Sequence, residues 1–125
     1  YAADLPDDLA GGALSISGLY DLREIVKVPS INCDVRLDEP SAIEASPALM
    51  PQPQHGILLT AVGERENRGF HIQHALIASR WKATVHSSRI CPGDNHFTVL
   101  DRLADESSDL FRDAINLLSG RMADA

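Results

Sequence analysis

The stretch HGILLTAVG, residues 55–63, decides the fold because its apolar residues are nearly continuous. A short uninterrupted apolar run is typical of a strand buried on both faces of a parallel sheet. Two weaker strand candidates lie on either side of it, at residues 14–18 and at residues 83–90, where Pro92 and Gly93 follow the second of them. The sequence therefore predicts three strands with residues 55–63 as the most buried.

Helical patterns separate or follow these strands. Residues 70–82 place Ile72 and Leu76, and Ile77 and Trp81, four positions apart, which predicts an amphipathic helix. A short helical pattern covers residues 97–103. A clearer helix follows, with an apolar stripe of Leu110, Phe111, Ala114, Ile115 and Leu118, a cap at Ser107 or Ser108, and a stop at Gly120.

Between the first two strands lies a proline-rich excursion, residues 22–54, which contains five of the prolines. We expect it to be irregular, with one short helix near residues 41–45. The order strand, excursion, strand, helix, strand, helix predicts an α/β fold with three parallel strands joined by right-handed crossovers. Three strands would leave an unpaired edge on the first one. We therefore expect residues 1–125, which open at Tyr1 without a methionine, to be the C-terminal part of a larger domain.

Composition excludes several classes of function. The chain has 125 residues and a formal net charge of −7, which repels nucleic acid and anionic membranes. No apolar segment approaches the length of roughly 20 residues that is needed to span a bilayer. The first residues do not have the pattern of a signal peptide. Cys33 and Cys91 are isolated, which favours a reducing compartment. The prediction is a cytoplasmic protein.

Titratable residues follow two of the predicted strands. Glu66 comes shortly after residues 55–63, and His96 comes shortly after residues 83–90. The carboxyl ends of parallel strands meet at one edge of a sheet, so we expect both side chains at the same rim. A carboxylate behind an imidazole fixes its tautomer and supports its work as a general base. The nucleophile is missing, since no G-x-S-x-G occurs in the chain.

Four segments together resemble the C-terminal half of the α/β-hydrolase esterases grouped with kynurenine formamidase: SISGLYDL, INCDVRLDEPSAIEASP, VGERENRGFHIQ and PGDNHF, within residues 15–97. The resemblance implies that His96 is the general base and Glu66 the orienting acid of a serine hydrolase that cleaves a formamide or ester. The family's acid is usually Asp, so Glu66 departs from the pattern. The serine and the oxyanion donors would lie in an N-terminal half, which becomes an expected partner. No cofactor and no metal are implied.

Several alternatives stay open at this stage. Glu64 is the rival acid. His71 and His74 could share a metal with Glu66, although we expect them to be solvent-facing helix residues. Cys91 is either a reactive thiol or, as we expect, a small buried residue. Tyr20 and Asp21 either support the site or simply end a strand, and Trp81 is expected to pack in the core.

Three functions remain. The first is an N-formylkynurenine formamidase, and the second is a general carboxylesterase or deacylase with the same machinery. The third is a non-catalytic truncated module that acts by binding a partner. In either enzyme, the isolated chain is expected to be inactive because it lacks the nucleophile. A homodimer through the open edge of the first strand is a further hypothesis.

Overall fold

The computed structural model describes residues 4–6 and 8–121, and Tyr1 lies outside the described residues. Along the chain its elements are β1 (Gly12–Ile16), α1 (Arg23–Val26), α2 (Pro29–Val35), α3 (Glu39–Glu44), η1 (Pro47–Leu49), β2 (Ile57–Gly63), α4 (Arg68–Arg80), β3 (Val85–Cys91), η2 (Thr98–Leu103) and α5 (Asp109–Leu118). The predicted order of strands and helices is confirmed, with boundaries shifted by at most two residues.

The sheet is parallel, with β2 in the centre and the strand order β1-β2-β3. Leu14 lies opposite Leu59, and Thr60 lies opposite Ser88. Six of the seven residues of β2 are buried because helices cover both faces of the sheet. The prediction of a three-stranded parallel α/β arrangement is therefore confirmed, and β1 is an edge strand of the described sheet.

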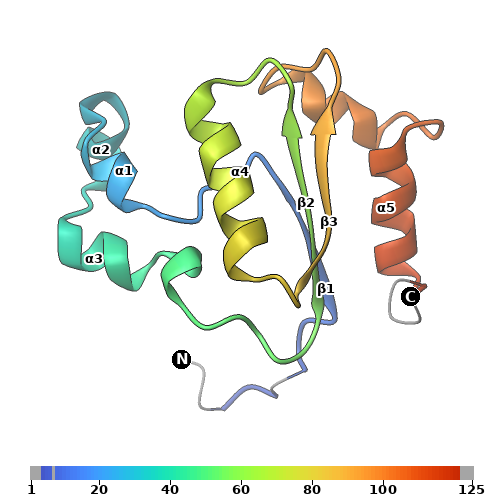
Figure 1. The fold of residues 1–125 in the computed structure, drawn as a ribbon, viewed down its shortest axis with the longest axis horizontal. Helices are drawn as coiled ribbons and strands as arrows, with labels where there is room; N and C mark the ends of the chain where they lie inside the picture. The colour runs from blue at the N-terminus through green and yellow to red at the C-terminus, as the bar shows by residue number, and fades with distance from the viewer. Residues whose placement is uncertain (1–3, 7, 122–125) are drawn as a thin grey trace.

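Two apolar clusters hold the layers together. On one face α4 packs over β2 and β3, with Leu58 and Ile77 in a cluster that Trp81 joins (Figure 1). On the other face η2 and α5 cover the sheet, and Val99 and Leu110 pack against Ala61. The expected packing role of Trp81 is confirmed. No helix in the described part of the chain is long and apolar enough to cross a membrane.

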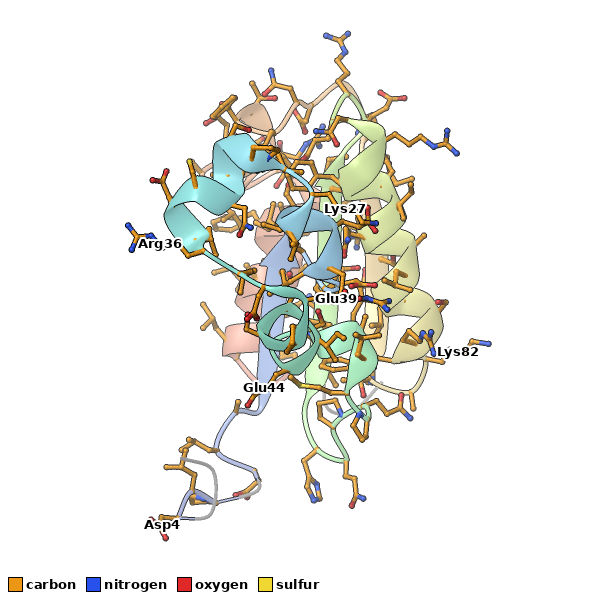
Figure 2. The ribbon with its side chains drawn as sticks, turned by 90° about the vertical axis from the view of Figure 1, so that its left-hand side faces the viewer. Asp4, Lys27, Arg36, Glu39, Glu44 and Lys82 are labelled. Carbon is orange, nitrogen blue, oxygen red and sulfur yellow. The ribbon has the colours of Figure 1, made fainter. Side chains whose placement is uncertain are left out.

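The excursion is more helical than predicted: the short helix expected near residues 41–45 is present as α3, but the expectation that the rest is irregular was wrong. It folds into α1, α2, α3 and η1, which lie outside α4 (Figures 1 and 2). Pro29, Pro40 and Pro47 stand in the first turns of three of these helices, where the missing N–H leaves no hydrogen bond unmade. Asp38 and Ser41 add a capping box to α3. Prolines that indicated loops thus mark helix starts.

The predicted helix faces are only partly correct. On α4, Ile77 is buried, but Ile72 is 54% exposed and the buried positions beside it are Gln73 and His74. On α5, Leu118 is exposed, whereas Asp113 is buried. Hydrophobic periodicity misses these polar residues because each has a partner that satisfies it, such as Arg89 for Asp113.

Candidate active site

Glu66 lies at the centre of a small polar cluster at the carboxyl end of the sheet. Its side chain is fully buried in the turn between β2 and α4. One carboxylate oxygen, Oε1, accepts hydrogen bonds from the backbone amide of Gly63 at 2.8 Å and from the hydroxyl of Ser17 at 2.5 Å. The other oxygen, Oε2, lies 2.8 Å from Nδ1 of His96. Three chain segments thus converge on one carboxylate.

This environment favours the ionised form of Glu66. Burial by itself would raise the pKa of the carboxyl group. The hydrogen bonds from Ser17, Gly63 and His96 outweigh burial, and together they lower the pKa below its ordinary value. Glu66 is therefore a carboxylate at neutral pH, suited to hold the proton of His96 on Nδ1.

His96 is held by the turn that follows β3. Oδ1 of Asn95 accepts a hydrogen bond from the amide of Thr98 at 2.9 Å, and the Thr98 hydroxyl accepts one from the Asn95 amide at 2.9 Å. Arg102, which follows the histidine in the chain, pairs with Asp94, which precedes it. These local bonds fix the backbone on either side of His96, so its ring is aimed by a rigid turn.

The ends of β2 and β3 approach closely at this point. A Cβ atom on Gly63 would lie only 2.5 Å from the carbonyl oxygen of Asp94, so the position requires glycine. The amide of Glu64 donates to the carbonyl of Cys91, and the amide of Arg65 donates to that of Asp94. The two turns that carry Glu66 and His96 are thereby joined.

One edge of the His96 ring remains open. The side chain is 48% exposed although Glu66 behind it is fully buried. The ring of Phe70, at the start of α4, lies 4.6 Å from the His96 ring between centroids. With Nδ1 bonded to Glu66, Nε2 has no hydrogen-bond partner among the described residues, and it is the nitrogen free to exchange a proton.

The rival acid, Glu64, has a different contact. Its Oε2 accepts a hydrogen bond from the amide of Gly93 at 2.7 Å, and it has no bond with His96. Glu64 therefore fastens the turn after β3. Of the two acids considered from the sequence, Glu66 is the one that the structure brings to His96.

The two helix histidines lie apart from this pair. His71 Nε2 is 3.1 Å from the carbonyl oxygen of Glu64. His74 is buried and bonds to Ser88 at 2.8 Å, so the expectation that it faces solvent was wrong. Burial, followed by the nearby His71, lowers its pKa. Within residues 4–6 and 8–121, no three His, Cys, Asp or Glu side chains are grouped to hold a metal ion.

Other predicted candidates have structural contacts. Cys91 is buried, as expected, and burial raises the pKa of its thiol. The Tyr20 hydroxyl bonds to Ser15 at 2.7 Å, and Asp21 forms an ion pair with Arg23. Neither Tyr20 nor Asp21 has a hydrogen bond to the Glu66–His96 pair within the described residues.

Sequence reasoning missed two residues of the cluster, Ser17 and Phe70. Ser17 directly follows β1 and has a φ of 51°, in the left-handed region that few non-glycine residues adopt. Its place at a strand end was a usable signal, because all three strands end at the same rim. Phe70 carried no signal beyond its apolar character, since its contact with His96 depends on the direction of α4.

Comparison with known proteins gives one structural match. No protein-family model matches the chain, and neither does any curated protein. Its structure is similar to the crystal structure of a candidate thioesterase from Silicibacter sp. TM1040, with a TM-score of 0.72 and 30% sequence identity. The match covers 83% of this chain but 38% of that protein, so the chain corresponds to well under half of its neighbour's length.

Proposed function

We propose that this chain is the C-terminal part of an α/β-hydrolase that cleaves acyl bonds, with His96 as general base and Glu66 as its orienting acid. The observation that carries the proposal is the 2.8 Å contact between Nδ1 of the half-exposed His96 and the buried Glu66 carboxylate. The similarity to a candidate thioesterase supports a hydrolase that acts on acyl esters.

In this mechanism a serine from the remainder of the hydrolase attacks the substrate's carbonyl carbon. Nε2 of His96 removes the serine proton, and the Glu66 carboxylate stabilises the imidazolium that forms. His96 then gives this proton to the leaving group as the carbonyl–leaving-group bond breaks, which leaves an acyl-serine. Water, deprotonated by His96, attacks that ester, and the acid product and free serine result. The reaction needs no cofactor.

Two substrate classes have separate support. The similarity of SISGLYDL and PGDNHF, residues 15–22 and 92–97, to the kynurenine formamidase group favours a formamide such as N-formylkynurenine. The structural neighbour favours a thioester or carboxylic ester. A non-catalytic module is the remaining alternative, and it assigns no task to the open edge of His96.

A serine-directed fluorophosphonate probe tests the proposal. We expect the product of the full open reading frame that encodes this chain to be labelled at a serine outside residues 1–125. Labelling should be lost in His96→Ala and kept in His86→Ala, which changes an exposed histidine on β3. The isolated chain should not be labelled. Equal labelling of the His96→Ala protein would contradict the role of His96.

A parallel substrate panel separates the two classes. N-formylkynurenine, an acyl-thioester and a p-nitrophenyl ester are compared by kcat/KM with the same preparation. Faster turnover of the formamide would assign the formamidase, whereas faster turnover of the thioester would assign the activity named for the structural neighbour. If none is cleaved in a His96-dependent manner, the hydrolase proposal fails.

A further inference from the structure

We propose that an apolar cavity between the excursion and α4 binds the alkyl chain of the substrate's acyl group. The cavity has a volume of about 420 Å³, within the range of small-molecule sites. Its apolar lining comes from α1, α2, α4 and the segment after β1, through Leu19, Ile25, Val28, Ile31, Phe70 and Ile72. This inference rests on the proposed function and names the substrate class of the same site: an ester or thioester, since the formyl group of a formamide has no alkyl chain.

The position of the cavity connects it to His96. Phe70 lines the cavity, and its ring also lies 4.6 Å from the His96 ring. Phe70 is thus shared between the wall of the cavity and the surroundings of the imidazole that would serve the reacting carbonyl. A second apolar cavity, of about 430 Å³, lies near Gly12 and Ile57, at the opposite ends of the strands from His96.

The lining favours an aliphatic ligand. Five of the six apolar residues are aliphatic, and several are exposed to solvent, including Ile31 at 45% and Ile72 at 54%. Covering them with an alkyl chain removes apolar surface from water. At the rim, Lys27 and Glu24 form an ion pair at 2.8 Å, so neither charge is left alone to select a charged group.

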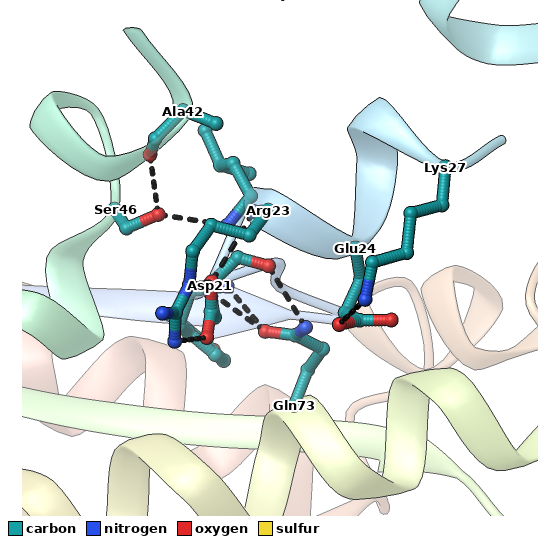
Figure 3. A network of polar contacts seen from close by, with 9 residues as sticks. Asp21, Arg23, Glu24, Lys27, Ala42, Ser46 and Gln73 are labelled. Carbon is teal, nitrogen blue, oxygen red and sulfur yellow. Dashed lines mark hydrogen bonds and ion pairs between the residues drawn. The ribbon is translucent and has the colours of Figure 1, made fainter. Parts of the chain in front are cut away.

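The polar residue Gln73 in the cavity wall is also satisfied. Its Oε1 accepts hydrogen bonds from the amides of Tyr20 and Asp21, both at 2.8 Å, and its Nε2 donates to the carbonyl of Asp21 at 3.0 Å (Figure 3). Gln73 thus ties the start of the excursion to α4 and holds the two walls in place. With its amide used in this way, it does not require a polar ligand.

A homologous series of carboxylates tests the cavity without catalysis. Acetate, butanoate, hexanoate and octanoate are titrated by NMR into the full open-reading-frame product that contains this chain. Affinity should rise by about two- to fourfold for each added CH₂ until the cavity is full. Ile31→Glu and Ile72→Glu should weaken octanoate binding at least tenfold, with binding of acetate unchanged.

Matched controls use apolar residues of similar exposure outside the cavity. Val35→Glu, on the same helix as Ile31, and Ile115→Glu, on α5, should leave octanoate binding unchanged. An affinity that does not depend on chain length, or an equal loss in control and cavity variants, would overturn the proposal. The proposal would also be overturned if a second copy or another segment of the protein fills the cavity. In that case the NMR signals of the cavity residues would not shift when octanoate is added.

Activity then distinguishes this inference from the function on which it rests. The substrates are p-nitrophenyl acetate and p-nitrophenyl octanoate. The cavity variants should no longer prefer the octanoate ester and should keep their turnover of the acetate ester. His96-dependent turnover with an unchanged preference would overturn the cavity but not the hydrolase. Carboxylate binding that strengthens with chain length, without any His96-dependent turnover, would overturn the hydrolase proposal. The assignment of the cavity to the acyl group would then fail with it.

Discussion

At the scale of single residues, the site depends on which groups bond to each of the two oxygens of one carboxylate. Oε1 of Glu66 is occupied by Ser17 and Gly63, which fixes the carboxylate plane and leaves Oε2 for His96. The glutamate side chain, longer than the aspartate that is usual in the resembling family, reaches Nδ1 of the imidazole at 2.8 Å. Of its three partners, Ser17 and His96 are distant in sequence and Gly63 is three residues away.

Glu66→Gln should lower kcat by about 10²- to 10⁴-fold, because an amide cannot stabilise the imidazolium. Glu64→Gln is the matched control, since the Glu64 side chain bonds to the Gly93 amide and not to His96, and the change should alter kcat less than tenfold. Steady-state kinetics on the full reading-frame product measures both. A larger loss in the Glu64 variant would show that the acid is misassigned.

Ser17→Ala should raise the pKa of Glu66, because it removes a hydrogen bond to the ionised carboxylate. In the wild type the folded-state pKa of Glu66 is lowered, so its stabilisation is present above the unfolded value of about 4.3 and is lost as pH falls. The variant should lose about 1–3 kcal/mol of unfolding free energy at pH 7 and less at pH 3. Denaturant unfolding at both pH values measures this difference, and an equal loss at both would contradict it.

At the scale of elements, α4 buries polar side chains that tie it to its neighbours. His74 bonds to Ser88 on β3, and Gln73 bonds to the chain after β1. Periodicity predicted the existence and approximate bounds of α4 but not its buried face. The partners that allow a histidine and a glutamine to be buried come from strands far along the chain, and no local pattern shows them.

Burial of His74 gives a pH dependence of stability. The pKa of His74 is lowered in the folded state. Below about pH 6.5, His74 therefore binds a proton more readily in the unfolded chain than in the folded chain. Unfolding free energy should therefore fall as pH decreases from 7.5 to 5.5. His74→Gln should flatten this slope, whereas His86→Gln, at an exposed position, should not. Thermal unfolding across this pH range checks it, and equal slopes in all three proteins would contradict it.

Gln73→Leu should loosen the excursion. It leaves two backbone amides, of Tyr20 and Asp21, without their acceptor, at a cost of about 1–3 kcal/mol each if they stay buried. Proteolysis within residues 22–54 should become faster than in wild type. Ser79→Ala, an exposed change on the same helix, is the control. Unchanged cleavage in Gln73→Leu would show that the excursion is held by other contacts.

At the scale of the whole molecule, the sequence predicted the parallel sheet and the meeting of Glu66 and His96. Both follow from general rules, because a continuous apolar run indicates a central strand and strand ends share a rim. The helical excursion and the Ser17 and Phe70 contacts were not predictable, since prolines indicate loops and helix starts alike. The match covers 38% of the structural neighbour, and a larger hydrolase stays a proposal.

The central claim is that the Glu66–His96 pair performs acyl-bond hydrolysis. Its most direct measurement is the kcat/KM of the full reading-frame product for ester, thioester and formamide substrates, in wild type and in His96→Ala. We expect the substitution to lower kcat/KM by at least about 10³-fold for whichever substrate is cleaved, with the fold intact. A His96→Ala protein that keeps wild-type turnover would contradict it.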